Sequence, residues 1–136
     1  MDIDELKENF SLFDEWEDRY RYLIDLGRAL PPLDEARKTD VYKVEGCMSQ
    51  VWLVPEAEAE GGRLSFRADS DSAIVKGLIA VLLVLFSGRT PQEILATDVD
   101  GVFRDLGLEA HISPNRRNGF FSMVDTIRRT AQAAVA

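Results

Sequence analysis

The only cysteine of this 136-residue chain lies in the segment Val44-Glu45-Gly46-Cys47-Met48-Ser49-Gln50-Val51-Trp52. Gly46 can adopt a positive φ without the steric cost of a Cβ atom, so it suits a tight turn. β-prone residues lie before and after this turn, which predicts that Cys47 is presented at a reversal of the chain. A free cysteine is either an inert core residue or a reactive thiol, and only its surroundings distinguish the two.

Strand patterns on both sides of this turn predict a small antiparallel sheet. Residues 41–44 form a short β-prone run, and residues 50 to about 58 place alternate side chains on two faces. Gly61-Gly62 is a turn signal, and residues 63–68 alternate well enough for a third strand. The pattern therefore predicts a three-stranded meander with Cys47 at its first reversal.

Helical patterns account for most of the remaining chain. Apolar residues recur at helical spacing before the sheet, where Gly27 is expected to end the second helix. The apolar run over residues 73–86 predicts a buried helix that is shorter than the ~20 residues needed to cross a bilayer. Further helices are expected from Pro91, Val99 and Pro114. The chain thus reads as one α+β domain over residues 1–136, with a three-stranded antiparallel sheet and helices packed mainly on one face.

Composition and charge narrow the range of functions. The net charge of −8 and the isoelectric point near 4.6 argue against nucleic-acid binding, which needs clustered Lys and Arg. One cysteine cannot form an internal disulfide, a Cys-x-x-Cys pair or a multi-cysteine metal site. The acidic start of the chain lacks the basic and apolar regions of a signal peptide. We therefore expect a cytoplasmic protein that binds neither nucleic acid nor membrane.

Five ordered segments of the chain resemble the SufE-like family of sulfur acceptor proteins, which work with cysteine desulfurases. The central one is the Cys47 segment, which is similar to the family's Gly-Cys-x-Ser-x-Val-Trp signature. The others match the family's amino-terminal helix, its central helix and two later landmarks, and they are residues 16–31, 68–78, 90–91 and 111–119. They occur in the family's order and are spread along the chain from residue 16 to residue 119, which makes the resemblance specific.

The resemblance implies a SufE/IscU-like fold and a role in iron–sulfur cluster assembly. Cys47 would accept persulfide sulfur from a SufS-like cysteine desulfurase, stimulate that enzyme, and pass the sulfur to a downstream iron–sulfur scaffold. The chain itself would bind no cofactor and would not be a stand-alone enzyme, since pyridoxal phosphate belongs to the partner desulfurase. The resemblance also implies a set of partner-binding residues, namely Arg116, Asp71, Gly46, Met48 and Ser49.

Simpler structural roles exist for some of these residues. Asp71 lies just before the helix expected over residues 73–86, where an aspartate can serve as the N-cap. Arg116 can be a solvated surface arginine, and the resemblance gives no support to its neighbour Arg117. Lys43 and the two arginines could lower the pKa of Cys47 only if the fold brings them close. We further expect Cys47 to be largely shielded in the free protein, with its loop moving outward on docking.

Other functions compete with this one. A CsdE-type acceptor would serve a different desulfurase or sulfur pathway through the same chemistry. A binding module would use the family surface alone and leave Cys47 inert. A thiol hydrolase would need His111 as its base, because it is the only histidine in the chain, and no hydrolase motif accompanies the pair.

Overall fold

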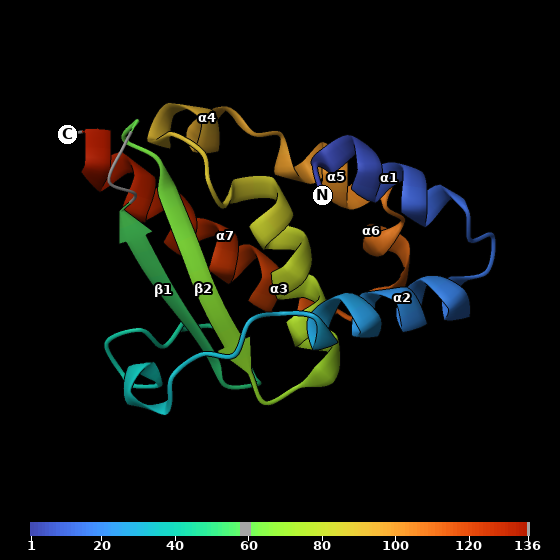
Figure 1. Cartoon of the computed structure of the whole chain (residues 1–136). Helices are drawn as coiled ribbons and strands as arrows, with labels where there is room; N and C mark the ends of the chain where they lie inside the picture. Colours follow the sequence, from blue (N-terminus) through green and yellow to red (C-terminus); the bar gives the residue numbers. More distant parts are fainter. Residues whose placement is uncertain (58–60, 136) are drawn as a thin grey trace.

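The computed structural model describes residues 1–57 and 61–135 and shows an α+β arrangement of helices packed on an antiparallel sheet (Figure 1). Within the described residues, two helices, α1 and α2, precede the sheet, and five follow it. The elements are α1 Ile3–Ser11, α2 Trp16–Arg28, the 3-10 turn η1 Glu35–Arg37, β1 Val51–Ala57, β2 Leu64–Ser70, α3 Ala73–Phe86, α4 Pro91–Ala96, α5 Val99–Asp105, α6 Leu108–His111 and α7 Pro114–Val135. None of the helices in the described part of the chain is long and apolar enough to cross a membrane.

The expectation of a three-stranded sheet is wrong, because the described residues form only two strands, β1 and β2. The run over residues 41–44 makes a single bridge, in which Lys43 pairs with Trp52. Turns on both sides keep this run from continuing as a strand, since the Tyr42 N–H bonds the Thr39 carbonyl and Gly46 has a φ of 87°. The expected end of the next strand near residue 58 lies outside the described residues.

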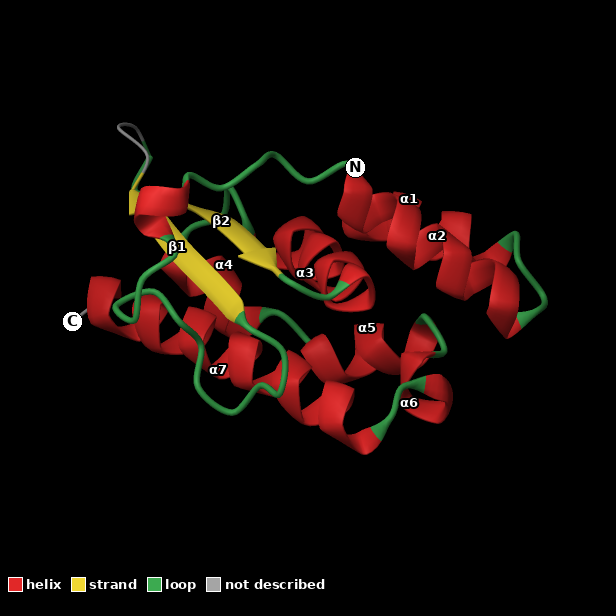
Figure 2. Ribbon diagram, turned by 90° about the horizontal axis from the view of Figure 1, so that it is seen from below, coloured by secondary structure: helices red, strands yellow, loops and turns green. Residues whose placement is uncertain are grey.

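The two strands bury alternate side chains of one face under helices α3 and α7. On β2, buried positions alternate with more exposed ones along the whole strand, which is the pattern of a sheet covered on one side. Figures 1 and 2 show α3 beside the strands and α7 running along the same side of the sheet. The other face is partly covered by the segment containing η1, because Lys38 lies 5.6 Å above the Trp52 ring.

Helix α3 is the centre of the core, and α2 packs tightly against it (Figure 2). Gly27 lies inside α2, so the expectation that it ends this helix is wrong. A Cβ atom on Gly27 would come within 2.7 Å of the Gly77 nitrogen, and one on Gly77 would come within 2.3 Å of the Leu23 carbonyl oxygen. The two glycines therefore allow the backbones of α2 and α3 to approach closely.

Candidate functional site

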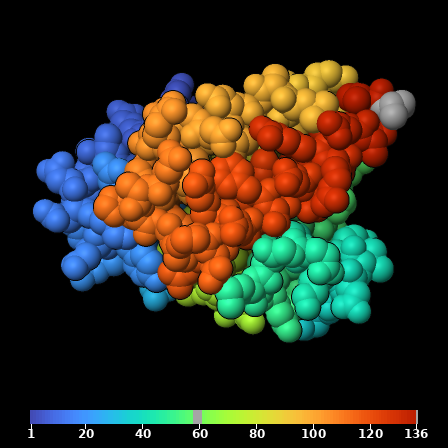
Figure 3. Space-filling model, turned by 180° about the vertical axis from the view of Figure 1, so that it is seen from behind, coloured from blue at the N-terminus to red at the C-terminus, as the bar shows by residue number. Residues whose placement is uncertain are grey.

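The Cys47 loop, residues 45–50 just before β1, lies across helix α7 and contacts it at Gly119 and Ser122. The Cys47 thiol lies 3.5 Å from the Gly119 carbonyl oxygen and donates a hydrogen bond to it. Gly46, at positive φ, packs so closely on Ser122 that a Cβ atom would come within 2.6 Å of the Ser122 Oγ. In the space-filling view, the cyan-to-green segment that includes this loop lies directly against the orange-to-red helix α7 (Figure 3).

A cavity of about 400 Å³ opens beside the thiol, between the loop and the amino-terminal half of α7. Three of the predicted site residues in the loop, Cys47, Met48 and Ser49, line it together with Arg116 of α7. The remaining walls come from the first strand, helix α3 and further residues at and after the start of α7, namely Val51, Val75, Leu78, Ser113, Asn115, Gly119, Phe120 and Met123. The fold thus joins residues that are far apart in the sequence into one recess with the thiol on its wall.

The surroundings of Cys47 favour its protonated form. The side chain is half-buried rather than largely shielded. Burial raises the pKa of the Cys47 thiol above its ordinary value, and the nearby Glu45 carboxylate raises that pKa further. Lys43 and the two arginines therefore do not lower the pKa of Cys47 in the free protein. The thiol is mainly protonated at neutral pH and is a weak nucleophile in this state.

Arg116 and Arg117 differ in their surroundings although they are neighbours at the start of α7. The Arg116 N–H bonds the Ser113 hydroxyl at 3.4 Å, which confirms Ser113 as the helix cap. No carboxylate of the described residues lies within 4.0 Å of the Arg116 guanidinium, which stays exposed at the cavity. Arg117 instead pairs with Glu109 at 3.4 Å and lies over the Phe121 ring. Of the two, Arg116 is the one available to a partner at the cavity.

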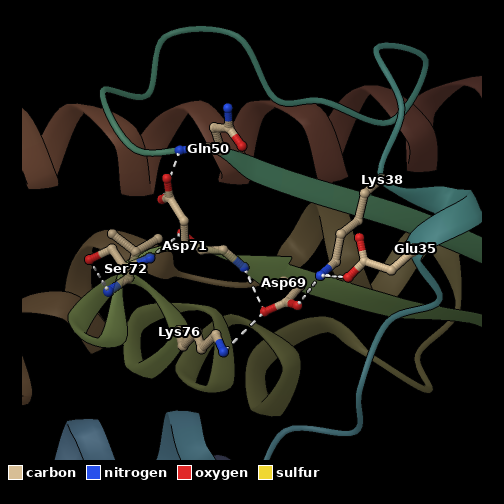
Figure 4. A network of polar contacts seen from close by, with 9 residues as sticks. Glu35, Lys38, Gln50, Asp69, Asp71, Ser72 and Lys76 are labelled. Atoms are coloured by element: carbon tan, nitrogen blue, oxygen red, sulfur yellow. Dashed lines mark hydrogen bonds and ion pairs between the residues drawn. The ribbon is translucent and has the colours of Figure 1, made fainter.

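Asp71 ties the end of the Cys47 loop to the start of α3 and does not cap that helix. Its carboxylate accepts a hydrogen bond from the Gln50 N–H at 3.1 Å. The N-cap is Ser72, whose Oγ accepts from the Val75 N–H. The expectation that Asp71 caps the helix is therefore wrong, because its side chain points to the loop (Figure 4).

A second carboxylate near the loop, Asp69 of β2, joins the sheet to two neighbouring segments. Asp69 lies between Lys38, at 3.1 Å, and Lys76 of α3, at 3.5 Å (Figure 4). Burial alone would raise the pKa of Asp69, but hydrogen bonds from Lys38 and from the Ser70 N–H hold this pKa below its ordinary value. This network fixes β2 in place, and β2 pairs with β1, which follows the Cys47 loop.

The Cys47 and His111 pair required by a thiol hydrolase is not assembled. The imidazole of His111 stacks on the Trp16 indole, with ring centroids 4.6 Å apart and an interplanar angle of 9°. His111 is absent from the cavity lining. Its role in this structure is to hold the end of α6 against α2.

Sequence reasoning missed the inner wall of the cavity. Gly119 places no side chain between α7 and the loop, so the thiol can approach the helix backbone. Phe120 and Met123 are buried below it and belong to the apolar stripe of α7. The helical spacing of these three residues is visible in the sequence, but only the path of the loop across α7 shows that this face meets Cys47.

Fold and site together define a small α+β protein with a single thiol on the wall of a cavity. The family model "SufE: Fe-S metabolism associated domain" matches residues 4–131. The chain therefore belongs to the SufE family, whose domain is associated with Fe–S metabolism. This confirms the resemblance seen in the five sequence segments.

Relatives in two rhizobia match nearly the full length of the chain. An uncharacterized SufE-like protein of Rhizobium meliloti is 45% identical over 132 residues, covering 96% of this chain and 94% of its own. A second uncharacterized SufE-like protein, from Rhizobium etli, is 45% identical over 136 residues, with 98% and 92% covered. The solution structure of a hypothetical protein from Thermus thermophilus superposes with a TM-score of 0.78 at 20% identity, covering 98% of this chain and 95% of the other. This last likeness concerns the fold alone.

Proposed function

We propose that this protein accepts sulfur as a persulfide on Cys47 from a cysteine desulfurase and passes it on for iron–sulfur cluster assembly. Membership of the SufE family supports a role in sulfur transfer. The observation that carries the proposal is the position of the chain's single thiol, on a loop at the wall of a cavity that is open to an approaching group. With no second cysteine in the chain, a persulfide formed there cannot be discharged as an internal disulfide.

The reaction is an exchange at sulfur that needs no added oxidant or reductant. The Cys47 thiolate attacks the outer sulfur of the donor persulfide and forms a new S–S bond. The donor's own S–S bond breaks, and its electron pair leaves with the donor cysteine as a thiolate. Cys47 then carries the transferred sulfur as its own persulfide, and the pyridoxal phosphate that releases sulfur from L-cysteine stays in the desulfurase.

The raised pKa of Cys47 fits a carrier that reacts only with its partner. In the free protein, burial and Glu45 keep the thiol protonated, so it reacts slowly with adventitious electrophiles. Activation requires a change on docking that brings positive charge to the thiol or moves it from its position against α7. Arg116 is exposed at the same cavity, and we expect it to meet the partner that brings this change.

The test mixes the protein with a cysteine desulfurase and L-cysteine and then measures its intact mass. We expect a gain of one sulfur atom on the wild-type chain and no gain on Cys47→Ser. The Cys47→Ser protein should keep its circular dichroism spectrum, because the side chain is only half-buried. It should also fail to stimulate the desulfurase.

Two outcomes would replace this proposal with one of its alternatives. Full stimulation of the desulfurase by Cys47→Ser would show a binding module whose cysteine is inert. Sulfur loading by a desulfurase outside the iron–sulfur system, with none from the SufS-like enzyme, would show a CsdE-type acceptor.

A further inference from the structure

The chain contains three methionines whose exposure differs widely. Met48, next to Cys47, is 83% exposed, and Met1 is 57% exposed. Met123 is only 1% exposed, although it lines the same cavity as Met48. One cavity therefore holds a thioether that solvent reaches freely and another that solvent barely reaches.

Met48 is also more open to oxidants than the thiol beside it. Cysteine reacts with peroxide as the thiolate, whereas a thioether has no proton to lose before it reacts. Cys47 is half-buried, its S–H is bonded to the Gly119 carbonyl, and its pKa is raised by burial and by Glu45. All of these features slow the reaction of Cys47, and none of them acts on Met48.

We propose that Met48 is the oxidant-sensitive residue of the Cys47 site and that peroxide converts its thioether to a sulfoxide before it oxidises Cys47. One oxygen atom moves from the peroxide to the Met48 sulfur, the O–O bond breaks, and the peroxide leaves as water or an alcohol. The sulfur is oxidised by two electrons and the peroxide is reduced by two. A thiol-dependent methionine sulfoxide reductase restores the thioether.

Oxidation at this position changes the surface that a sulfur donor must meet. Met48 stands at the opening of a recess whose other apolar walls include Val75, Leu78 and Phe120. A sulfoxide replaces an apolar, flexible side chain with a polar one, and such a group disfavours docking against an apolar partner surface. This step rests on the proposed function. It would reversibly stop sulfur acceptance while the Cys47 thiol remains intact.

The order of oxidation is tested by peptide mapping after graded exposure of the full chain to hydrogen peroxide. We expect sulfoxide to appear on Met48 and Met1 first, while Met123 stays unmodified and Cys47 can still be alkylated after unfolding. Met1 is the reference for an exposed methionine away from the site, and Met123 is the reference for a buried one within it. Oxidation of Cys47 before or together with Met48 would overturn the proposal.

The effect on sulfur acceptance is tested with wild type and Met48→Leu, each compared with its own untreated sample. After mild peroxide treatment, we expect the wild type to lose sulfur acceptance in proportion to its Met48 sulfoxide and to regain it with the reductases. Met48→Leu should lose none. Equal losses in both proteins would overturn the proposal. An untreated wild type that accepts no sulfur would instead contradict the proposed function, and the peptide map would still report the order of oxidation.

Discussion

At the scale of single residues, the site combines a weakly reactive thiol with the exposed guanidinium of Arg116. Cys47 is held against the Gly119 carbonyl, and both burial and Glu45 raise its pKa. Arg116 lies on the same cavity without a carboxylate partner among the described residues. A neighbouring positive charge stabilises a thiolate or a persulfide anion. The free protein therefore holds the thiol in its unreactive form, in the same cavity as an exposed arginine.

The contribution of Glu45 can be measured directly. Glu45→Gln removes the negative charge that is the second cause of the raised pKa, so the pKa of Cys47 should fall while burial still holds it above its ordinary value. The rate of alkylation by iodoacetamide should then rise and reach half its maximum at a lower pH. Glu15→Gln, at the start of α2, is the control. Identical pH profiles for Glu45→Gln and wild type would show that burial alone sets the pKa.

Arg116→Ala should weaken the complex with the desulfurase and leave Cys47 chemically competent. If Arg116 forms a buried ion pair with the desulfurase, the loss of binding free energy should be ~2–5 kcal/mol. If Arg116 lies at the rim of the interface, this loss should be smaller and salt-dependent. Arg117→Ala is the matched control, because Arg117 already pairs with Glu109. Titrations at two salt concentrations measure the affinity of both variants for the desulfurase. If Arg116→Ala binds the desulfurase as tightly as wild type at both salt concentrations, the docking surface does not include Arg116.

At the scale of elements, the close packing of α2 on α3 positions the helix that forms one wall of the cavity. Gly27 and Gly77 remove the side chains that would hold the two backbones apart. Val75 and Leu78, on the same helix as Gly77, line the recess beside Cys47. Any displacement of α3 would therefore also change the shape of the site.

Gly77→Ala should destabilise the protein although alanine is the better helix former. The helix preference is worth ~1 kcal/mol. A Cβ atom 2.3 Å from the Leu23 carbonyl oxygen forces the helices apart, and such overpacking costs about 1–3 kcal/mol or more. Gly119→Ala is the control for stability, because its Cβ atom would lie 3.4 Å or more from its neighbours. Urea unfolding measures the stability of both variants. Equal midpoint urea concentrations for Gly77→Ala and Gly119→Ala would show that α3 can shift freely.

At the scale of the whole molecule, several carboxylates join distant segments, and their pKa values link stability to pH. Asp69 joins β2 to Lys38 and to α3, and its pKa lies below the ordinary value. The pKa of Glu93 is lowered as well, chiefly by the hydrogen bond from the Thr90 N–H in the capping box that begins α4. A carboxylate with a lowered folded pKa stabilises the protein above its unfolded pKa, and this stability is lost as pH falls through the folded pKa.

We therefore expect the free energy of unfolding to decline as pH falls below about 4. Asp69→Asn should be less stable than wild type at pH 7, and the difference should shrink toward pH 2 as Asp69 of the wild type becomes protonated. Urea unfolding at a series of pH values measures this. Asp100→Asn, at an exposed position of α5, is the control. A difference between Asp69→Asn and wild type that stays constant with pH would mean that the charge of Asp69 contributes nothing.

Much of this fold could be predicted from the sequence, because most helices carry strong local signals. The apolar run of α3 and the Thr90 and Ser113 caps gave nearly correct boundaries. The strand expected at residues 41–44 is wrong, because β propensity there does not reveal the turns that confine this run to one bridge. Gly27 was misassigned, because a glycine that ends a helix and one that admits a neighbouring helix look alike in one sequence.

The candidate site was predictable only in part. The loop residues and Arg116 could be named from the sequence, and the structure brings Cys47, Met48, Ser49 and Arg116 to one cavity. The sequence does not show the hydrogen bond from Gln50 to Asp71 or the approach of Gly119 to Cys47, because each joins segments that are distant in the sequence. Local pattern shows which residues are unusual, but only tertiary structure shows which of them meet.

The two hydrogen bonds that fasten the Cys47 loop also make its opening visible to hydrogen exchange. The Val44 N–H is held by the Val51 carbonyl and the Gln50 N–H by the Asp71 carboxylate, so one protected amide lies at each end of the loop. Each can exchange its proton for deuterium only while its bond is broken. If the loop opens as a unit, the two amides show the same free energy of opening once each rate is corrected for its intrinsic exchange rate. If it frays from one end, their protection factors differ, and the less protected amide identifies the end that opens first.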